Sequence, residues 1–177
     1  MAVFISLLRG INVSGHKIIK MAVLKSMYEE LGYTNVKTYL QSGNVIFETC
    51  NKENAHLEKK ISAMITTKFG FDVSVFVLTT DQLYDIITKN VYKDDNSKDP
   101  KFLHVTFLTS KPKMFDFGTI ESKKADNEEI AITGNVIYLY CPDGYGKTKL
   151  TNNFLETKLK VSATTRNWKT ITELSKY

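Results

Sequence analysis

The two arginines are the side chains of this chain best suited to gripping an anion. Of 24 lysine and arginine residues, only Arg9 and Arg166 are arginines. A guanidinium presents a rigid planar fork of donors that fits a carboxylate or phosphate, whereas the lysine ammonium is a point charge. A chain that otherwise uses lysine is expected to keep arginine for a bidentate anion site or a buried pair.

Basic residues also gather at both ends of the sequence. Residues 1–28 carry Arg9, Lys17, Lys20 and Lys25 without any acid, and residues 147–177 carry seven lysines and arginines against two acids. The formal net charge is +5. Basic clusters favour an anionic partner, a small molecule or a nucleic acid. The alternative is an ordinary solvated lysine surface.

Arg166 is followed closely by Trp168, the only tryptophan. This pair can hold a phosphate and stack a base. In the alternative interpretation, Trp168 anchors the last helix in the core and Arg166 binds backbone carbonyls. We favour that alternative for Trp168, because large aromatic side chains usually dominate cores.

Other catalytic or cofactor motifs are incomplete. The stretch Gly144-Tyr-Gly-Lys-Thr148 follows an expected strand, but a P-loop needs glycine five positions before Gly146, where Cys141 stands. The three histidines, His16, His56 and His104, lack zinc-ligand spacing. We therefore expect neither a metal nor a cofactor.

The elements that must position these residues are duplicated. Residues 36–50 alternate around Gly43-Asn44 and predict a β-hairpin with a two-residue type II′ turn. The pattern recurs 91 positions later, with Thr133-Gly-Asn-Val-Ile-Tyr138 matching Ser42-Gly-Asn-Val-Ile-Phe47. Residues 102–108 likewise match residues 2–8 at a shift of 100.

Periodicity predicts a β-α-β-β-α-β order in each half. Strands are expected at 2–8, 36–40, 45–47, 73–78, 102–108, 129–132, 136–141 and 162–165, and helices at 21–31, 54–69, 81–89, 149–159 and 168–176. The fold class is therefore α+β, with two ferredoxin-like halves and a terminal helix. We expect the first half at residues 1–80, a connecting helix and linker at 81–100, and a second half, eroded in its first connection, at 101–177.

The ferredoxin-like topology places the loop after the first strand beside the first hairpin turn. The repeat acts as a control, because polar residues found in one copy only are candidates for function. Gln41 and Arg9 are such residues, with Ile132 and Thr109 as their expected counterparts. The candidate ligand-binding residues are Arg9, Gly10, Asn12, Lys17, Gln41 and Arg166. The alternative is that Arg9 pairs with a carboxylate such as Glu48, while Asn12 and Ser14 only shape a turn.

Several motifs resemble one bacterial family. They are Leu8-Arg-Gly-Ile-Asn-Val-Ser-Gly15, Lys20-Met21, Val36-Lys-Thr-Tyr39, Gln41-Ser-Gly-Asn-Val45 and Thr164-Thr-Arg-Asn-Trp168. Together they resemble the family called domain of unknown function 1697. The resemblance implies a two-part ferredoxin-like protein that is soluble and has no assigned activity or catalytic residues. Ser14 and Lys147-Thr-Lys-Leu150 depart from the family pattern.

Three functions are compatible with these observations. The first is a binding module for a ligand that carries phosphate or carboxylate, including a nucleotide or nucleic acid. The second is an enzyme acting on a phosphorylated small molecule, and the third is a homo-oligomeric structural protein. No apolar run is long enough to span a membrane, and two cysteines make no disulfide framework. We expect a soluble, cytoplasmic protein with no membrane partner.

Overall fold

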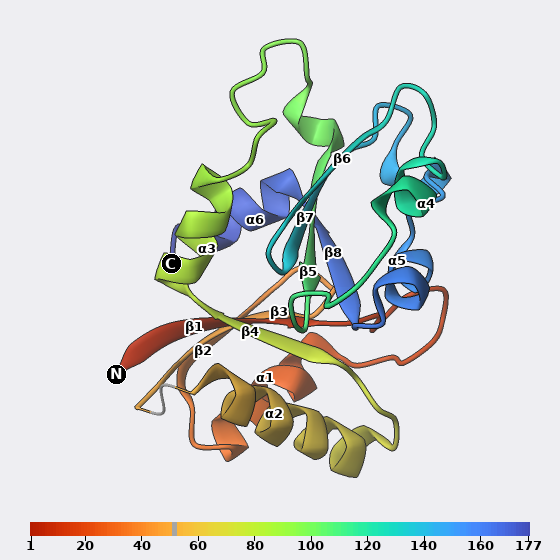
Figure 1. The fold of residues 1–177 in the computed structure, drawn as a ribbon. Coiled ribbons are helices and arrows are strands. Elements are labelled where there is room, and N and C mark those ends of the chain that lie inside the picture. The colour runs from red at the N-terminus through yellow and green to blue at the C-terminus, as the bar shows by residue number, and fades with distance from the viewer. Residues whose placement is uncertain (51–52) are drawn as a thin grey trace. The chain divides into compact units, whose positions relative to one another are not determined.

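The structure, a computed structural model, describes residues 1–50 and 53–177. Figure 1 shows the ribbon. The first half contains β1 (Ala2–Leu8), α1 (Met21–Glu30), β2 (Thr34–Tyr39), β3 (Asn44–Thr49), α2 (Asn54–Phe69), β4 (Val75–Thr79) and α3 (Thr80–Thr88). The second contains η1 (Pro100–Phe102), β5 (Leu103–Leu108), α4 (Phe117–Glu121), β6 (Glu129–Thr133), β7 (Val136–Tyr140), η2 (Tyr145–Lys147), α5 (Asn152–Leu159), β8 (Ala163–Asn167) and α6 (Trp168–Leu174).

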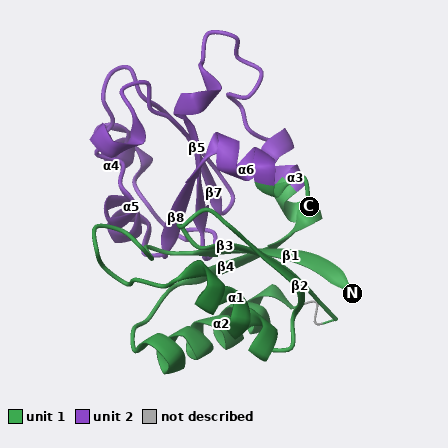
Figure 2. Ribbon diagram, turned by 180° about the vertical axis from the view of Figure 1, so that it is seen from behind, with its two compact units in different colours: residues 1–83, 174–177 green, residues 84–173 purple. Residues whose placement is uncertain are grey.

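The chain divides into two compact units, which Figure 2 colours separately. Unit 1 consists of residues 1–83 and 174–177, and unit 2 of residues 84–173. Each unit holds one four-stranded antiparallel sheet, in the order β2-β3-β1-β4 or β6-β7-β5-β8. In both sheets the first and third strands of the unit are central, as the ferredoxin-like pattern requires. The predicted fold class is confirmed.

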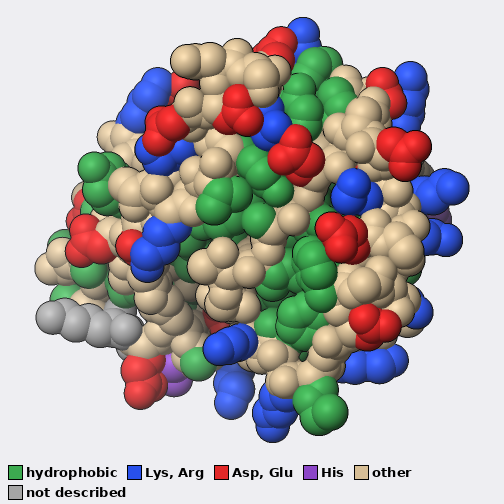
Figure 3. Space-filling view, turned by 45° about the horizontal axis from the view of Figure 1, so that its top comes forward, with side chains coloured by type: hydrophobic (Ala, Val, Ile, Leu, Met, Phe, Trp, Pro, Cys, Tyr) green, Lys and Arg blue, Asp and Glu red, His purple; other side chains and the backbone are tan. Residues whose placement is uncertain are grey.

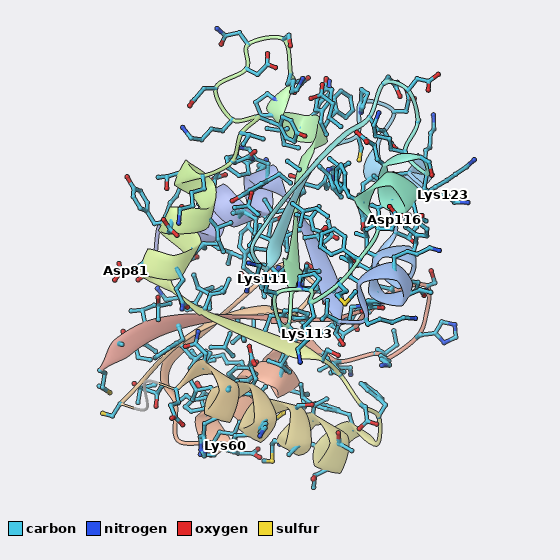
Figure 4. All side chains as sticks on the ribbon, viewed as in Figure 1. Lys60, Asp81, Lys111, Lys113, Asp116 and Lys123 are labelled. Atoms are coloured by element: carbon cyan, nitrogen blue, oxygen red, sulfur yellow. The ribbon has the colours of Figure 1, made fainter. Side chains whose placement is uncertain are left out.

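In unit 1, α1 and α2 cover one face of the sheet. Their apolar residues pack on Phe4, Leu8, Val45 and Phe47, which are buried. Gly70 closes α2 in the left-handed region, at φ 77°. The C-terminal end of α1 is satisfied by a cation. The Lys60 ammonium of α2 (Figure 4) donates to the carbonyl of Leu31, the C-cap of α1, at 3.1 Å.

In unit 2, a smaller core contains Leu108, Ile137 and Leu139 from the sheet and Leu155 from α5. The connection after β5 was expected to be eroded and without a helix. It contains the short helix α4, whose Ile120 is fully buried in this core. Five residues without a clear periodic pattern were too few to predict a helix, and burial of Ile120 stabilises it.

The first hairpin differs from the prediction. Tyr39 pairs with Asn44, so four residues, 40–43, connect β2 and β3. Asn44 is the buried first residue of β3, and its amide donates to the Tyr39 carbonyl at 2.8 Å and to the Ser42 hydroxyl at 3.0 Å. The predicted two-residue turn at Gly43-Asn44 is therefore wrong, because the Asn44 side chain closes a wider loop.

The second hairpin does have a two-residue turn, since Thr133 pairs with Val136. As a result, residues that match in the sequence repeat do not occupy matching positions in the two sheets, but differ by one position. Val45 packs against the helices of unit 1, whereas the core position on β7 belongs to Ile137 and not to Val136. Ile132 pairs with Ile137 as Thr38 pairs with Val45, so Ile132 is the counterpart of Thr38 and not of Gln41.

No helix in the described part of the chain is both long enough and apolar enough to cross a membrane. Cys50 is exposed and Cys141 is buried, and both are free thiols. Burial and the nearby carboxylate of Glu128 raise the pKa of the Cys141 thiol to about 12. This thiol is protonated at neutral pH, which makes it a poor nucleophile.

Candidate functional site

Two loops of unit 1 lie side by side at one end of its sheet. They are residues 9–20, between β1 and α1, and residues 40–43, between β2 and β3; we call them together the rim. The Leu8 N–H donates to the Gly43 carbonyl, and the Asn12 side chain donates to the Gln41 carbonyl, each at 2.9 Å. The expected adjacency of the loop after the first strand and the hairpin loop is confirmed.

Asn12 braces the rim. Its amide nitrogen donates to the Ile19 carbonyl at 3.0 Å as well as to Gln41, and its amide oxygen accepts from the Ile19 N–H at 2.8 Å. Both amide hydrogens are thus used within the protein. The φ of Asn12 is 54°, in the left-handed region that asparagine tolerates better than most residues. Asn12 therefore fixes the loop, as the alternative interpretation held, and the start of α1 with it.

Arg9 and Gly10 begin the rim. The Arg9 N–H donates to the Ser74 carbonyl at 2.9 Å, and Gly10 adopts a φ of 67°. Arg9 is half-buried. Glu48 pairs with Val3, six residues before Arg9, or about 20 Å along a strand. The suggested Arg9–Glu48 ion pair is therefore wrong.

Lys17 and Lys20 carry the other charges of the rim. Lys17 is exposed; its ammonium donates to the Asp72 carbonyl and lies 5.9 Å from the centre of the Phe71 ring. The Asp72 carboxylate accepts from the Thr66 hydroxyl at 2.9 Å. Lys20 is exposed and stands at the N-cap of α1, without a side-chain cap. Within the described residues, neither lysine forms an ion pair.

The beginning of α1 adds partial positive charge to the rim. Its first turn contains no acid, and no side chain caps it. The first N–H groups of a helix have no partner within the helix, and the helix dipole is positive at this end. The Asn12–Ile19 hydrogen bonds hold this helix start beside the loop. Side chains, dipole and backbone donors therefore act in the same direction electrostatically.

Arg166 belongs to unit 2 and is only 7% exposed. Its guanidinium donates to the Thr164 hydroxyl at 2.9 Å and to the Thr165 carbonyl at 3.0 Å. Burial lowers the pKa of the Arg166 guanidinium to about 10, which still leaves it charged at neutral pH. The contact with the Thr165 carbonyl agrees with the alternative in which Arg166 binds backbone carbonyls.

The incomplete P-loop motif has a structural role. Tyr145 lies in η2, stacks on His104 with ring centres 4.9 Å apart, and donates to the Thr165 hydroxyl at 3.0 Å. Helix α5 begins later, at Asn152, with Thr151 as its N-cap. Because Gly146 lies in η2, and residues 148–151 separate η2 from α5, these residues do not form a phosphate-binding helix start.

The described residues contain no group of three or more His, Cys, Asp or Glu side chains arranged for a metal ion. On the face of the molecule shown in Figure 3, lysines and arginines are interspersed with aspartates and glutamates. A continuous basic surface is absent from that face.

The fold defines the class: an α+β protein with two ferredoxin-like units. The chain belongs to the family described as "Protein of unknown function (DUF1697)", whose model matches residues 1–138. That stretch contains the whole rim. A search of curated proteins gave no match.

A solved structure has a similar fold. It is that of a conserved bacterial protein from Streptococcus pneumoniae, with 22% sequence identity and a TM-score of 0.71. The similarity covers 99% of this chain and 97% of the other. At this identity the likeness concerns the fold alone.

Proposed function

We propose that this protein is a binding module for an anionic ligand that carries phosphate or carboxylate, and that the rim of unit 1 is its site. The observation that carries the proposal is the union, in one braced loop, of Arg9, Lys17 and Lys20 with an uncapped helix start. No acidic residue occurs between positions 1 and 28. Charge-assisted hydrogen bonds to such an anion are stronger than neutral ones.

The residues of the rim have different roles in this proposal. Arg9 offers a planar fork to two oxygens of the anion, whereas Lys17 and Lys20 supply point charges. Gln41 is exposed on the facing loop and offers an amide. Asn12 binds no ligand; it positions the loop through its three hydrogen bonds.

The backbone of the loop supports a functional role. Gly10, Asn12, Ser14, Gly15 and Lys17 all have positive φ. A left-handed conformation costs an ordinary L-residue roughly 1–2 kcal/mol. Glycine adopts this conformation without strain. Strained residues such as Ser14 and Lys17 persist where the surrounding structure holds them in place, and they cluster at ligand sites. The Asn12 brace is what holds them here.

The partner can be a small anion or the backbone of a nucleic acid, and salt separates the two. A nucleic acid held through phosphates loses affinity steeply with salt, with a log–log slope close to the number of phosphates neutralised. A flat salt response would therefore leave the small anion as the partner. The two free cysteines suit the reducing cytoplasm that we propose as its location.

A thermal-shift screen tests the proposal. The wild-type protein is heated with inorganic phosphate, pyrophosphate, phosphosugars, nucleotides, and short RNA and DNA. A compound that binds the folded state raises the melting temperature. We expect at least one such shift, and we expect it to be lost in Arg9→Ala and reduced in Lys20→Ala.

Lys59→Ala is the matched control, because Lys59 is also exposed in unit 1 but lies on α2, outside the rim. It removes the same charge and should keep the full shift. If Lys59→Ala and Lys20→Ala reduce the shift equally, the effect is one of net charge, and the rim is not the site.

A further inference from the structure

Unit 2 contains a groove that shares no residue with the rim. It is a groove of about 300 Å³ lined by Pro100, Lys101, Trp168, Lys169 and Thr172. All five residues belong to unit 2. The volume is at the lower end of the range for small-molecule sites, and it suits a single planar ring system.

Two walls form the groove, and Asn167 ties them together. Its amide nitrogen donates to the Lys101 carbonyl in η1 at 3.0 Å, and its amide oxygen accepts from the Lys169 N–H in α6 at 2.9 Å. Asn167 is also the last residue of β8 and pairs with His104 of β5. The Asp99 carboxylate accepts from the Lys101 N–H at 3.0 Å and fixes the first wall. The groove is therefore preorganised on both sides by hydrogen bonds between the Asn167 and Asp99 side chains and the backbone.

Trp168 supplies the aromatic surface. It is half-buried, whereas Tyr138, the largest aromatic residue in the interior of unit 2, is 1% exposed. Across residues 1–50 and 53–177, no aromatic ring stacks on Trp168 and no acceptor binds its indole N–H. Part of the Trp168 side chain is therefore accessible in the groove. Tryptophan is the best side chain for stacking on a planar ring or holding a cation.

Two lysines give the groove its charge. The Lys101 side chain is 66% exposed, and its ammonium lies 2.8 Å from Asp99 Oδ2. An exposed pair of this kind contributes little to stability, so Lys101 can exchange Asp99 for a ligand oxygen at low cost. Lys169 is exposed and pairs with no carboxylate of the described chain. No acidic side chain lines the groove.

We propose that this groove binds a mononucleotide, whose base stacks on Trp168 and whose phosphate lies between Lys101 and Lys169. A stacking surface alone would accept any planar ring, and two ammonium groups alone would accept any anion. Their union on facing, tied walls selects a ligand that carries both features. This site is independent of the rim, because it involves other residues in the other unit.

Trp168 makes the test direct, since it is the only tryptophan of the chain. Adenosine 5′-monophosphate (AMP) is titrated against the intrinsic fluorescence, excited at the red edge of the indole band, where the base does not absorb. We expect saturable quenching by AMP. Adenosine, which lacks the phosphate, should bind at least about tenfold more weakly, and ribose 5-phosphate, which lacks the base, should not quench.

The variants separate the two features. Replacing both lysines, Lys101→Ala with Lys169→Ala, should weaken AMP about tenfold and leave adenosine unchanged. Lys123→Ala, at the end of the α4 segment in the same unit (Figure 4), is the matched control and should bind AMP as the wild type does. Trp168→Leu has no fluorescence, so it is studied by calorimetry, with circular dichroism to confirm folding; it should lose AMP binding.

Three results would overturn the proposal. They are a linear, non-saturable quench, equal affinity for AMP and adenosine, and AMP binding that survives in a folded Trp168→Leu variant. The Lys20→Ala variant of the rim should keep the AMP response of Trp168. If AMP does not bind in the groove, the function proposed for the rim is unaffected. If no anion binds at the rim, the proposal for the groove is unaffected.

Discussion

Asn12, which the sequence predicts to contact a ligand, holds the rim together through three hydrogen bonds. The sequence pattern is compatible with ligand binding and with turn formation, because asparagine also favours turns through side-chain hydrogen bonds to the nearby backbone. The choice depends on Ile19 and Gln41, which reach Asn12 only after α1 and the first hairpin have folded. No local pattern contains that information.

The variant Asn12→Gly tests the brace without adding backbone strain, since glycine accepts the φ of 54°. It removes three hydrogen bonds of 2.8–3.0 Å. We expect the free energy of unfolding to fall by about 1–3 kcal/mol in urea denaturation. Ser14→Gly changes a residue of similar φ in the same loop and should stay within about 1 kcal/mol of the wild type. Equal losses in the two variants would show that Asn12 acts through its backbone only.

His104 gives a pH-dependent prediction. Burial lowers the pKa of its imidazole below the value in the unfolded chain, about 6.5. As the pH falls through that value, the unfolded state binds the proton first, so the folded state loses stability. The stability that buried, neutral His104 contributes is fully present above about pH 6.5, and it is lost as the pH falls toward the pKa in the folded state.

His104→Phe removes this titration and places at the site the residue type that β1 has at the matching position, Phe4. Urea denaturation between about pH 5 and pH 7.5 should show a flatter dependence of stability on pH for the variant. Parallel profiles for the two proteins would mean that His104 is not desolvated.

At the scale of elements, the two hairpins show how far a repeated pattern determines structure. Six similar residues predicted both hairpins, and both exist. The loop lengths differ because the Asn44 amide binds Tyr39 and Ser42, while Gly43 lies against β1 and the loop that follows it. These contacts are tertiary, so the same Gly-Asn pair forms a two-residue turn in one unit and ends a four-residue loop in the other.

Alanine substitution of the two matched glycines measures this difference. A Cβ at Gly43 would lie 2.7 Å from Ile11 Cδ1 and 2.8 Å from Leu8 Cβ, whereas at Gly134 it would meet nothing within 4 Å. Both residues have positive φ, 75° and 63°. We expect Gly134→Ala to cost about 1–2 kcal/mol of stability and Gly43→Ala about 1–3 kcal/mol more, measured by chemical denaturation. Equal costs would contradict the close approach of Gly43 to β1.

At the scale of the whole molecule, hydrophobic periodicity and glycine helix ends were sufficient to predict two ferredoxin-like halves. They were not sufficient to predict which face of a strand is buried. Arg166 pairs with Val105 of β5 and lies on the opposite face of β8 from Ala163, which belongs to the small core of unit 2. Trp168, two residues later and already in a helix, is of intermediate burial. The face on which Arg166 lies depends on the pairing of β8 with β5.

The central claim is that the rim of unit 1 binds an anion. The most direct measurement is a titration of the ¹⁵N-labelled protein with pyrophosphate, followed residue by residue through its amide NMR signals. We expect saturable shifts concentrated at Gly10, at Ser42 and at the first residues of α1, and we expect Arg9→Ala to abolish them. Shifts that are absent, or that spread evenly over exposed lysines such as Lys59 and Lys123, would contradict it.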